Sequence, residues 1–265
     1  MTLTIILLII TLLLPISSHA EPYDEALTAY HKKDYAVALQ WFTELEKGPT
    51  LTEFVEVAEW DNPEASMADL ETYWMNNYGP RRRAEAQFYL GVMYDEGFGV
   101  APNHQEAVRW YTQAAEGGEP AAQFNLALMY EHGDGVTQDY QKAVRWYTSA
   151  AHRGNLKAQL ILATMCEQGT GVPQDYTQAM EWYRKAAEAG IPIAMNSLGV
   201  VYEYGNGVPQ DYVLAHQWYN LAAARAREPD GRDKYTKNRD SLARNMTGQQ
   251  IAEAQRLATQ WKPTP

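Results

Sequence analysis

The hydrophobic pattern of this chain repeats itself every 36 residues between Ala84 and Ala226. The first copy reads AEAQFYLGVMYDEGFGVAPNHQEAVRWYTQAAEGGE, and three further copies follow it without a gap. Each copy holds two apolar stripes of helical spacing separated by a glycine-containing break, which predicts two amphipathic helices per copy. A fixed period of this length is typical of a solenoid, whose units bury their apolar faces by stacking on one another. We therefore expect an all-α solenoid.

A Gly-x-Gly loop separates the two predicted helices of every copy. Its first glycine suits the left-handed residue that follows a helix, and its second allows a further tight bend. The loop follows a helix rather than a strand and lacks the third glycine and the Lys-Ser/Thr pair of a phosphate-binding loop, so that interpretation is rejected. The glycine pairs are Gly97 and Gly99, Gly133 and Gly135, Gly169 and Gly171, and Gly205 and Gly207.

A hydrogen-bond acceptor stands where the second helix of each copy begins, and such residues are preferred N-caps. Glu106 and Gln178 stand three residues after two of them and predict capping boxes there. These acceptors therefore have a structural task and are not interpreted as catalytic: Asn103, Asp139, Asp175 and Asp211.

The segments around the four copies are less regular. Residues 21–48 predict a divergent first helix pair, and 227–265 predict capping helices, with a helix from about Asp233 and a second one opened by a capping box at Thr247. Residues 49–83 break the pattern and form either a degenerate helix pair or an insertion. Three arginines at 81–83 sit badly with the positive end of a helix, which suggests nearby acids such as Asp95 or Glu96.

The first twenty residues are expected to lie outside the fold. Leu3 to Leu14 is apolar apart from two threonines, and Ser18 and Ala20 suit a signal-peptidase site with cleavage after Ala20. The apolar run is shorter than the ~20 residues of a spanning helix. We expect export to the periplasm and no stable membrane insertion after cleavage, although the segment before the apolar run carries no Lys or Arg.

Composition narrows the class of partner. The net charge is −11, which disfavours nucleic acid and anionic lipid surfaces. The single cysteine, Cys166, occupies a position that holds tyrosine in the other copies, so it is expected to be buried. Because the chain has a single cysteine, it cannot form an intrachain disulfide.

The repeated text resembles the Sel-one-like repeat, a relative of the tetratricopeptide repeat, and the chain is similar to exported bacterial members of that family. The resemblance rests on positions such as Ala86, Leu90, Tyr94, Trp110 and Gly118 and their equivalents in the later copies. It implies a right-handed superhelical solenoid of antiparallel helix pairs that acts as an adaptor. Some disulfide-rich members have been described as penicillin-binding or β-lactam-hydrolysing proteins, but this chain lacks their paired cysteines.

No catalytic, metal or cofactor site is predicted. The histidines do not stand at metal-ligand spacings, no cysteine cluster exists, and a Ser-x-x-Lys pair for acyl chemistry is absent. His104 occupies a position that holds tyrosine in the later copies and is interpreted as a packing variant.

The candidate site is a surface on the first helices of the copies. Positions that vary between copies form an aromatic and polar row, and an acidic row runs beside it, which favours a basic or amphipathic segment of another protein. Alternatively, the aromatic residues pack between layers and the acids are solvated or paired. The candidate partner-binding residues are Phe88, Asp95, Phe124, Asn125, Glu131, Glu167, Asn196 and Glu203.

We therefore expect a non-catalytic periplasmic adaptor or regulator of an envelope process that binds another protein. The alternative is a peptidoglycan- or β-lactam-binding or hydrolysing protein.

Overall fold

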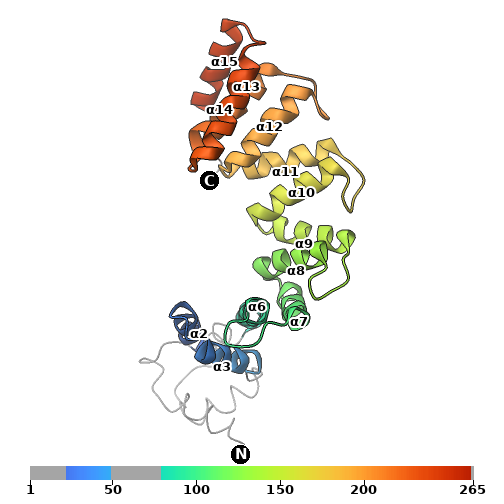
Figure 1. The fold of residues 1–265 in the computed structure, drawn as a ribbon, viewed down its shortest axis with the longest axis vertical. Coiled ribbons are helices and arrows are strands. Elements are labelled where there is room, and N and C mark those ends of the chain that lie inside the picture. The colour runs from blue at the N-terminus through green and yellow to red at the C-terminus, as the bar shows by residue number, and fades with distance from the viewer. Residues whose placement is uncertain (1–21, 49–78, 264–265) are drawn as a thin grey trace, which may run out of the picture. The chain divides into compact units, whose positions relative to one another are not determined.

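A computed structural model describes residues 22–48 and 79–263, and within these ranges the chain forms twelve α-helices and no strand (Figure 1). The prediction of an all-α repeat fold is confirmed. The chain divides into two compact units, Met1–Gln138 and Asp139–Pro265. No helix in the described ranges is long and apolar enough to span a membrane. The expected signal segment 1–20 and most of 49–83 lie outside the described residues.

The first unit contains five described helices, each packed on the next in chain order. Figure 1 shows α6 and α7 as neighbours, and these two helices pack on each other. Their bounds are α2 Pro22–His31, α3 Tyr35–Glu46, α6 Pro80–Glu96, α7 His104–Glu116 and α8 Pro120–His132.

The first helix pair packs directly on the first clear repeat, because α3 contacts α6. A Cβ on Gly99 would lie 2.9 Å from the Tyr35 carbonyl oxygen, and one on Gly171 would lie 2.6 Å from the Tyr140 carbonyl oxygen in a later repeat. The pair α2–α3 therefore stands where a preceding repeat stands elsewhere. Because α3 and α6 are in direct contact, we favour an insertion over a degenerate helix pair for residues 49–83. This interpretation stays a prediction.

The interface between α3 and α6 is aromatic. Tyr35 stacks on Phe98 with ring centroids 4.6 Å apart, and Phe42 stacks on Tyr89 at 4.8 Å. Phe42 is fully buried. Stacked and edge-on rings add to the energy of area burial, so aromatic contacts strengthen an interface that also packs alanines and leucines such as Ala38, Leu45 and Leu90.

The second unit contains seven helices. Each packs on its successor except the last two, which both pack on α13. Their bounds are α9 Tyr140–His152, α10 Leu156–Gln168, α11 Tyr176–Glu188, α12 Pro192–Tyr204, α13 Tyr212–Arg225, α14 Pro229–Ala243 and α15 Gly248–Gln260.

The Gly-x-Gly loops end the first helix of each repeat as expected. At the end of α12, Gly205 has φ of 72° and caps the helix in the left-handed region. Gly207 also has a positive φ, and a Cβ there would lie 2.6 Å from the Cβ of Tyr176. The second glycine therefore serves a close approach between successive repeats as well as a bend.

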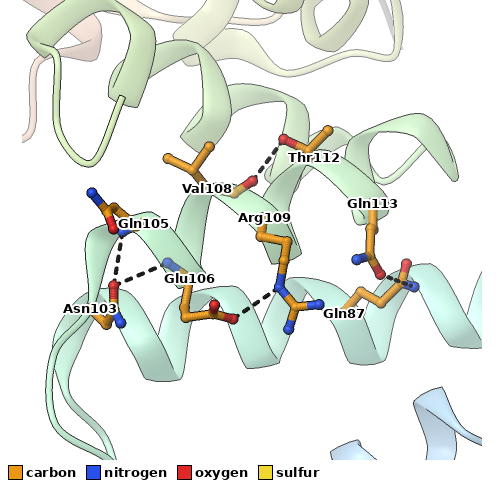
Figure 2. Close-up of polar contacts among 8 residues, drawn as sticks. All are labelled: Gln87, Asn103, Gln105, Glu106, Val108, Arg109, Thr112 and Gln113. Carbon is orange, nitrogen blue, oxygen red and sulfur yellow. Dashed lines mark hydrogen bonds and ion pairs between the residues drawn. The ribbon is translucent and has the colours of Figure 1, made fainter. Parts of the chain in front are cut away.

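The N-cap predictions for the second helices are confirmed. Asn103 accepts from the amides of Gln105 and Glu106 (Figure 2), and the three aspartates cap their helices in the same way. The two predicted capping boxes are wrong. Glu106 instead accepts from Arg109 Nε at 2.9 Å, and Gln178 accepts from the Cys166 thiol at 3.0 Å.

Buried tyrosines, leucines and alanines fill the space between helices. Tyr111, Tyr147 and Tyr219 at the second helices are fully buried, as are Leu90 and Leu126 at the first. Small residues admit the rings: a Cβ on Gly199 would lie 2.5 Å from the Tyr219 ring.

Glutamine amides add polar bonds between helices. Gln123 Nε2 of α8 donates to the Ala115 carbonyl of α7, and Gln87 Nε2 of α6 donates to Gln113 Oε1 of α7 (Figure 2). Gln123 is buried. Such a bond satisfies a carbonyl in the last turn of a helix, which has no partner within the helix itself.

The C-terminal helices confirm one prediction and correct another. Thr247 and Gln250 form the predicted reciprocal capping box of α15. The preceding helix begins at Pro229 rather than near Asp233, because proline at the first helical position is already set for helical φ.

The arginines at 81–83 belong to α6, which starts before the predicted boundary at 84. Their expected pairing with Asp95 or Glu96 is wrong. Arg81 and Arg82 pair with Glu85, at 3.0 Å and 3.1 Å, one turn along the same helix. The Arg82 guanidinium also lies 4.3 Å from the centre of the Tyr23 ring, which ties α6 to α2.

Candidate protein-binding surface

A hollow of about 290 Å³ opens in the first unit between the C-terminal ends of α6 and α8. Its wall combines acidic, other polar and apolar side chains. Helix C-termini carry partial negative charge, which adds to that of the carboxylates. The lining residues are Val92, Asp95, Glu96, Tyr111, Asn125, Leu128, Met129, His132 and Asp134.

Asp95 is held on both carboxylate oxygens. Its Oδ1 lies 2.9 Å from His104 Nδ1, and its Oδ2 accepts from the Tyr111 hydroxyl at 3.4 Å. His104 is half exposed, so its interpretation as a packing variant is corrected: its ring orients an acid of the hollow.

Tyr111 forms the buried floor beneath this acid. Burial, then the charge of Asp95, raises the pKa of Tyr111 well above its usual range, while a hydrogen bond from Asn125 acts in the opposite direction. The hydroxyl therefore stays protonated, and it links an acid of α6 with an amide of α8. The positions of Asp95 and Asn125 are thus set by a buried group.

The same tyrosine–acid pair recurs in the second unit. Tyr183 donates to Glu167 at 2.8 Å and Tyr219 donates to Glu203 at 2.5 Å, and the partners stand sixteen positions apart, as in the first pair. Burial first, and a hydrogen bond with Glu167 among the further causes, raises the pKa of Tyr183 to about 12. The acidic row is consequently half-buried and ordered.

An apolar stripe lies on α12 of the second unit. Ile193, Val200 and Tyr204 stand at i, i+7 and i+11, so they share one helical face. Ile193 is 51% exposed and Tyr204 is 65% exposed, the largest values among the exposed large hydrophobic residues of the described chain. Tyr204 follows Glu203 in the sequence, but the Glu203 carboxylate is half-buried and bonded to Tyr219.

The structure brings together only some of the predicted site residues. Asp95 and Asn125 line the hollow. Phe88 and Phe124 are half-buried, and the Phe88 ring lies 6.1 Å from that of Tyr111. Glu131 is half-buried and engaged.

Asn196 is corrected, because it is buried and accepts from Asn238 Nδ2 of α14 at 2.8 Å. It is therefore covered by the C-terminal helices and does not belong to an exposed row. Glu167 and Glu203 remain on the surface as half-buried partners of their tyrosines.

Sequence reasoning missed most of the apolar wall and Tyr111. Val92 and Leu128 occupy the same position in successive copies, one turn before Asp95 and Glu131. That spacing was available in the repeat. Asp134, the middle residue of a Gly-x-Gly loop, carried no comparable signal, because loop residues are placed by the fold.

Cys166 is buried, as predicted, and burial raises the pKa of its thiol. Among the described residues, no group of three or more His, Cys, Asp or Glu side chains is arranged to hold a metal ion.

Comparison with known proteins identifies the repeats. The Sel1 repeat family matches residues 28–44, 84–119, 120–155, 156–191 and 192–226. No curated protein sequence matches the chain significantly.

Solved structures that are similar to the chain include two Sel1-type repeat proteins. A Sel1 repeat protein from Oxalobacter formigenes shares 30% identity over 75% of this chain and 86% of its own, with a TM-score of 0.55. A protective antigen of uropathogenic Escherichia coli, described as displaying an SLR fold, shares 32% identity over 89% of this chain, with a TM-score of 0.59. This chain spans 51% of that antigen.

Sel1 repeat proteins generally act as non-catalytic scaffolds for protein–protein interaction. The match over five segments of the chain and the all-helical repeats lead to the same assignment. The chain belongs to the Sel1 repeat family.

Proposed function

We propose that this protein is an adaptor that binds a basic, amphipathic segment of another protein on the first helices of its repeats. It does so without catalysing a reaction, as a regulator of an envelope process. The family supplies the general role, and the surface described above supplies the chemistry of the partner.

The hollow between α6 and α8 carries this proposal. Lysine and arginine combine an apolar stem with a cationic head. Val92, Leu128 and Met129 offer apolar wall for a stem, while Glu96 and Asp134 offer charge for a head. In the second unit, Ile193 and Tyr204 of α12 offer exposed apolar surface for the apolar side of such a segment.

Charge reversal at the hollow tests the proposal. The double variant Glu96→Lys, Asp134→Lys changes two hollow-lining acids that carry no structural bond among the described contacts. Binding is measured by fluorescence anisotropy with a synthetic amphipathic helix bearing lysines, and with the same helix bearing glutamates. We expect the lysine peptide to bind better, and its affinity for the variant to fall by about tenfold or more, equivalent to ~1.4 kcal/mol.

The matched control is Glu116→Lys, Glu181→Lys. Both acids are exposed and lie outside the hollow, and the net charge changes equally. An equal loss of affinity in this control, or equal binding of the glutamate peptide, would show that no specific acidic site exists. Circular dichroism of all variants verifies that the helices are intact.

We also propose that the protein works in the periplasm. The apolar run from Leu3 to Leu14, followed by Ser18 and Ala20, supports export and cleavage. The intact mass of the protein recovered from a periplasmic fraction should correspond to a chain beginning at Glu21. Recovery only with residues 1–20 attached, or only from another fraction, would contradict this location.

A further inference from the structure

A buried histidine lies where the last repeat meets the C-terminal helices. His216 on α13 is 3% exposed, and its Nδ1 has no hydrogen-bond partner. A buried polar atom without a partner costs free energy, and a charged ring in this place would cost more. This group takes no part in the proposed partner-binding surface.

The repeat shows that histidine is a departure at this position. The equivalent residues of the three preceding repeats are Val108, Val144 and Met180. All three are apolar and cannot take up a proton. The histidine occurs only in the copy whose second helix is covered by α14 and α15.

The α13–α14 interface places a positive charge near this ring. Arg239 of α14 donates to Asn220 Oδ1 at 3.3 Å, and Asn220 lies one turn from His216 on the same face of α13. Arg239 and Asp240 are the charged groups whose fields reach the ring. Burial, then the Arg239 charge, lowers the pKa of His216, while Asp240 acts in the opposite direction.

The charged groups on the other elements packed on α13 are engaged elsewhere. On α12, Glu203 is bonded to Tyr219. On α15, Glu253 and Arg256 pair with each other. On α13 itself, Arg225 lies over the Trp261 ring.

The helix α14 packs along α13 but buries few side chains of its own. Only Tyr235 and Leu242 are buried on it. Its polar links include Asn238 to Asn196 at 2.8 Å, Arg239 to Asn220 at 3.3 Å and Arg232 to the Ala226 carbonyl at 3.0 Å. Because little apolar area on α14 is buried, a charge added at His216 should be enough to weaken the docking of this helix.

We propose that α14 is an acid-sensitive clasp on the last repeat, which protonation of His216 loosens. Loosening exposes Asn196 and the α13 surface around Ala215 and Tyr219, which Leu242 covers in the closed state. The clasp thereby couples the accessible surface at this end of the repeats to pH.

The sign follows from proton linkage. The ring is held neutral when α14 is docked, so the loosened state binds the proton more tightly. The contribution of His216 to the docking of α14 is complete above the ordinary histidine pKa of ~6.5 and declines as pH falls below it. Carboxylates with ordinary pKa values near 4 stay ionised at about pH 5, so this window isolates histidine.

Hydrogen exchange of the full mature chain, read by mass spectrometry, tests the clasp. Protection of the α14 amides, corrected for intrinsic exchange at each pH, should fall several-fold between about pH 7.5 and about pH 5. The α10 and α11 amides should keep theirs. In His216→Met, which restores the residue of the third repeat, α14 should stay protected at both pH values.

His152→Gln is the matched control, because His152 is exposed in the same unit, and it should lose α14 protection as the wild type does. Unchanged α14 protection in the wild type, an equal loss in His216→Met, or an equal loss throughout α9 to α11 would each overturn the proposal.

A second variant keeps the test decisive if His216→Met fails to fold. Arg239→Gln removes the positive charge that opposes protonation, so its α14 protection should fall less on acidification than that of the wild type. An equal or larger fall would overturn the proposal.

Discussion

The last regular repeat and the C-terminal helix pair are built differently although they pack together. Helix α13 buries seven residues, including Tyr219 and Leu221, whereas α14 buries two and α15 buries only Ala254. The repeat has neighbours on both sides, so both faces of its helices are covered. The terminal pair packs mainly on α13, and α14 also bonds α12 through Asn238 and Asn196.

This difference changes what holds each region in place. The repeat is stabilised mainly by apolar burial and by glycines that permit close approach. The terminal pair relies on the Thr247 capping box and on polar links from Asn238 and Arg239. Such links are individually worth about 0.5–1.5 kcal/mol. A repeat stack of this kind should therefore be least stable at its C-terminal end.

Matched leucines should show the largest contrast. Leu198 of α12 and Leu242 of α14 are each 1% exposed, so Leu198→Ala and Leu242→Ala remove the same buried group. Leu→Ala substitutions cost about 2.7–5 kcal/mol, depending on how far the site collapses. We expect Leu198→Ala near the top of this range and Leu242→Ala near the bottom, because α14 can shift on α13.

The free energies of unfolding come from urea titrations followed by circular dichroism. A larger loss for Leu242→Ala than for Leu198→Ala would break the comparison, since the terminal pair would then be as tightly packed as the repeats.

Two glycines give a smaller contrast. Gly207 has a φ of 75° and no room for a Cβ, whereas a Cβ on Gly248, at the start of α15, would meet no heavy atom within 4 Å. Gly207→Ala should cost about 2 kcal/mol or more from the left-handed backbone and the contact with Tyr176. Gly248→Ala should be neutral or stabilising by less than about 1 kcal/mol. Thermal unfolding of the two variants measures this, and similar losses would contradict it.

Repetition explains how much of the fold could be predicted. Each core position occurs in four copies, so one ambiguous residue is interpreted by its equivalents, as Cys166 was by the tyrosines. The caps at Asp175 and Thr247 were predictable because they act within a few residues. The partner chosen by one long side chain was not predictable. Gln178, for example, accepts from the Cys166 thiol and does not bond its own N-cap.

The candidate site was less predictable because it depends on contacts between distant elements. Asp95 and Asn125 were correctly placed on the surface of the first helices, but their common link to Tyr111 joins three helices. Asn196 occupied the same repeat position as Phe88 and Phe124, yet α14 covers it. The register of a terminal helix against the stack is not encoded in the repeat period.

Two buried tyrosines give the smallest contrast. Tyr183 bonds Glu167 and lies 3.3 Å from the Thr164 hydroxyl, whereas burial alone raises the pKa of Tyr235 in α14. Tyr183→Phe should cost about 1–1.5 kcal/mol at neutral pH, because a bond to a carboxylate is lost. Tyr235→Phe should cost less. Urea titrations at neutral pH measure both variants.

Alkaline pH sharpens this last comparison, and the sign follows from the raised pKa. The Tyr183 hydroxyl ionises near 12 in the folded protein and near 10 in the unfolded chain. Its contribution is therefore complete below pH ~10 and is lost as pH rises toward ~12. The stability difference between wild type and Tyr183→Phe should shrink across this interval. A difference that stays constant or grows would show that the pKa of Tyr183 is not raised in the folded protein. The tyrosine–acid pair would then not stabilise the repeats.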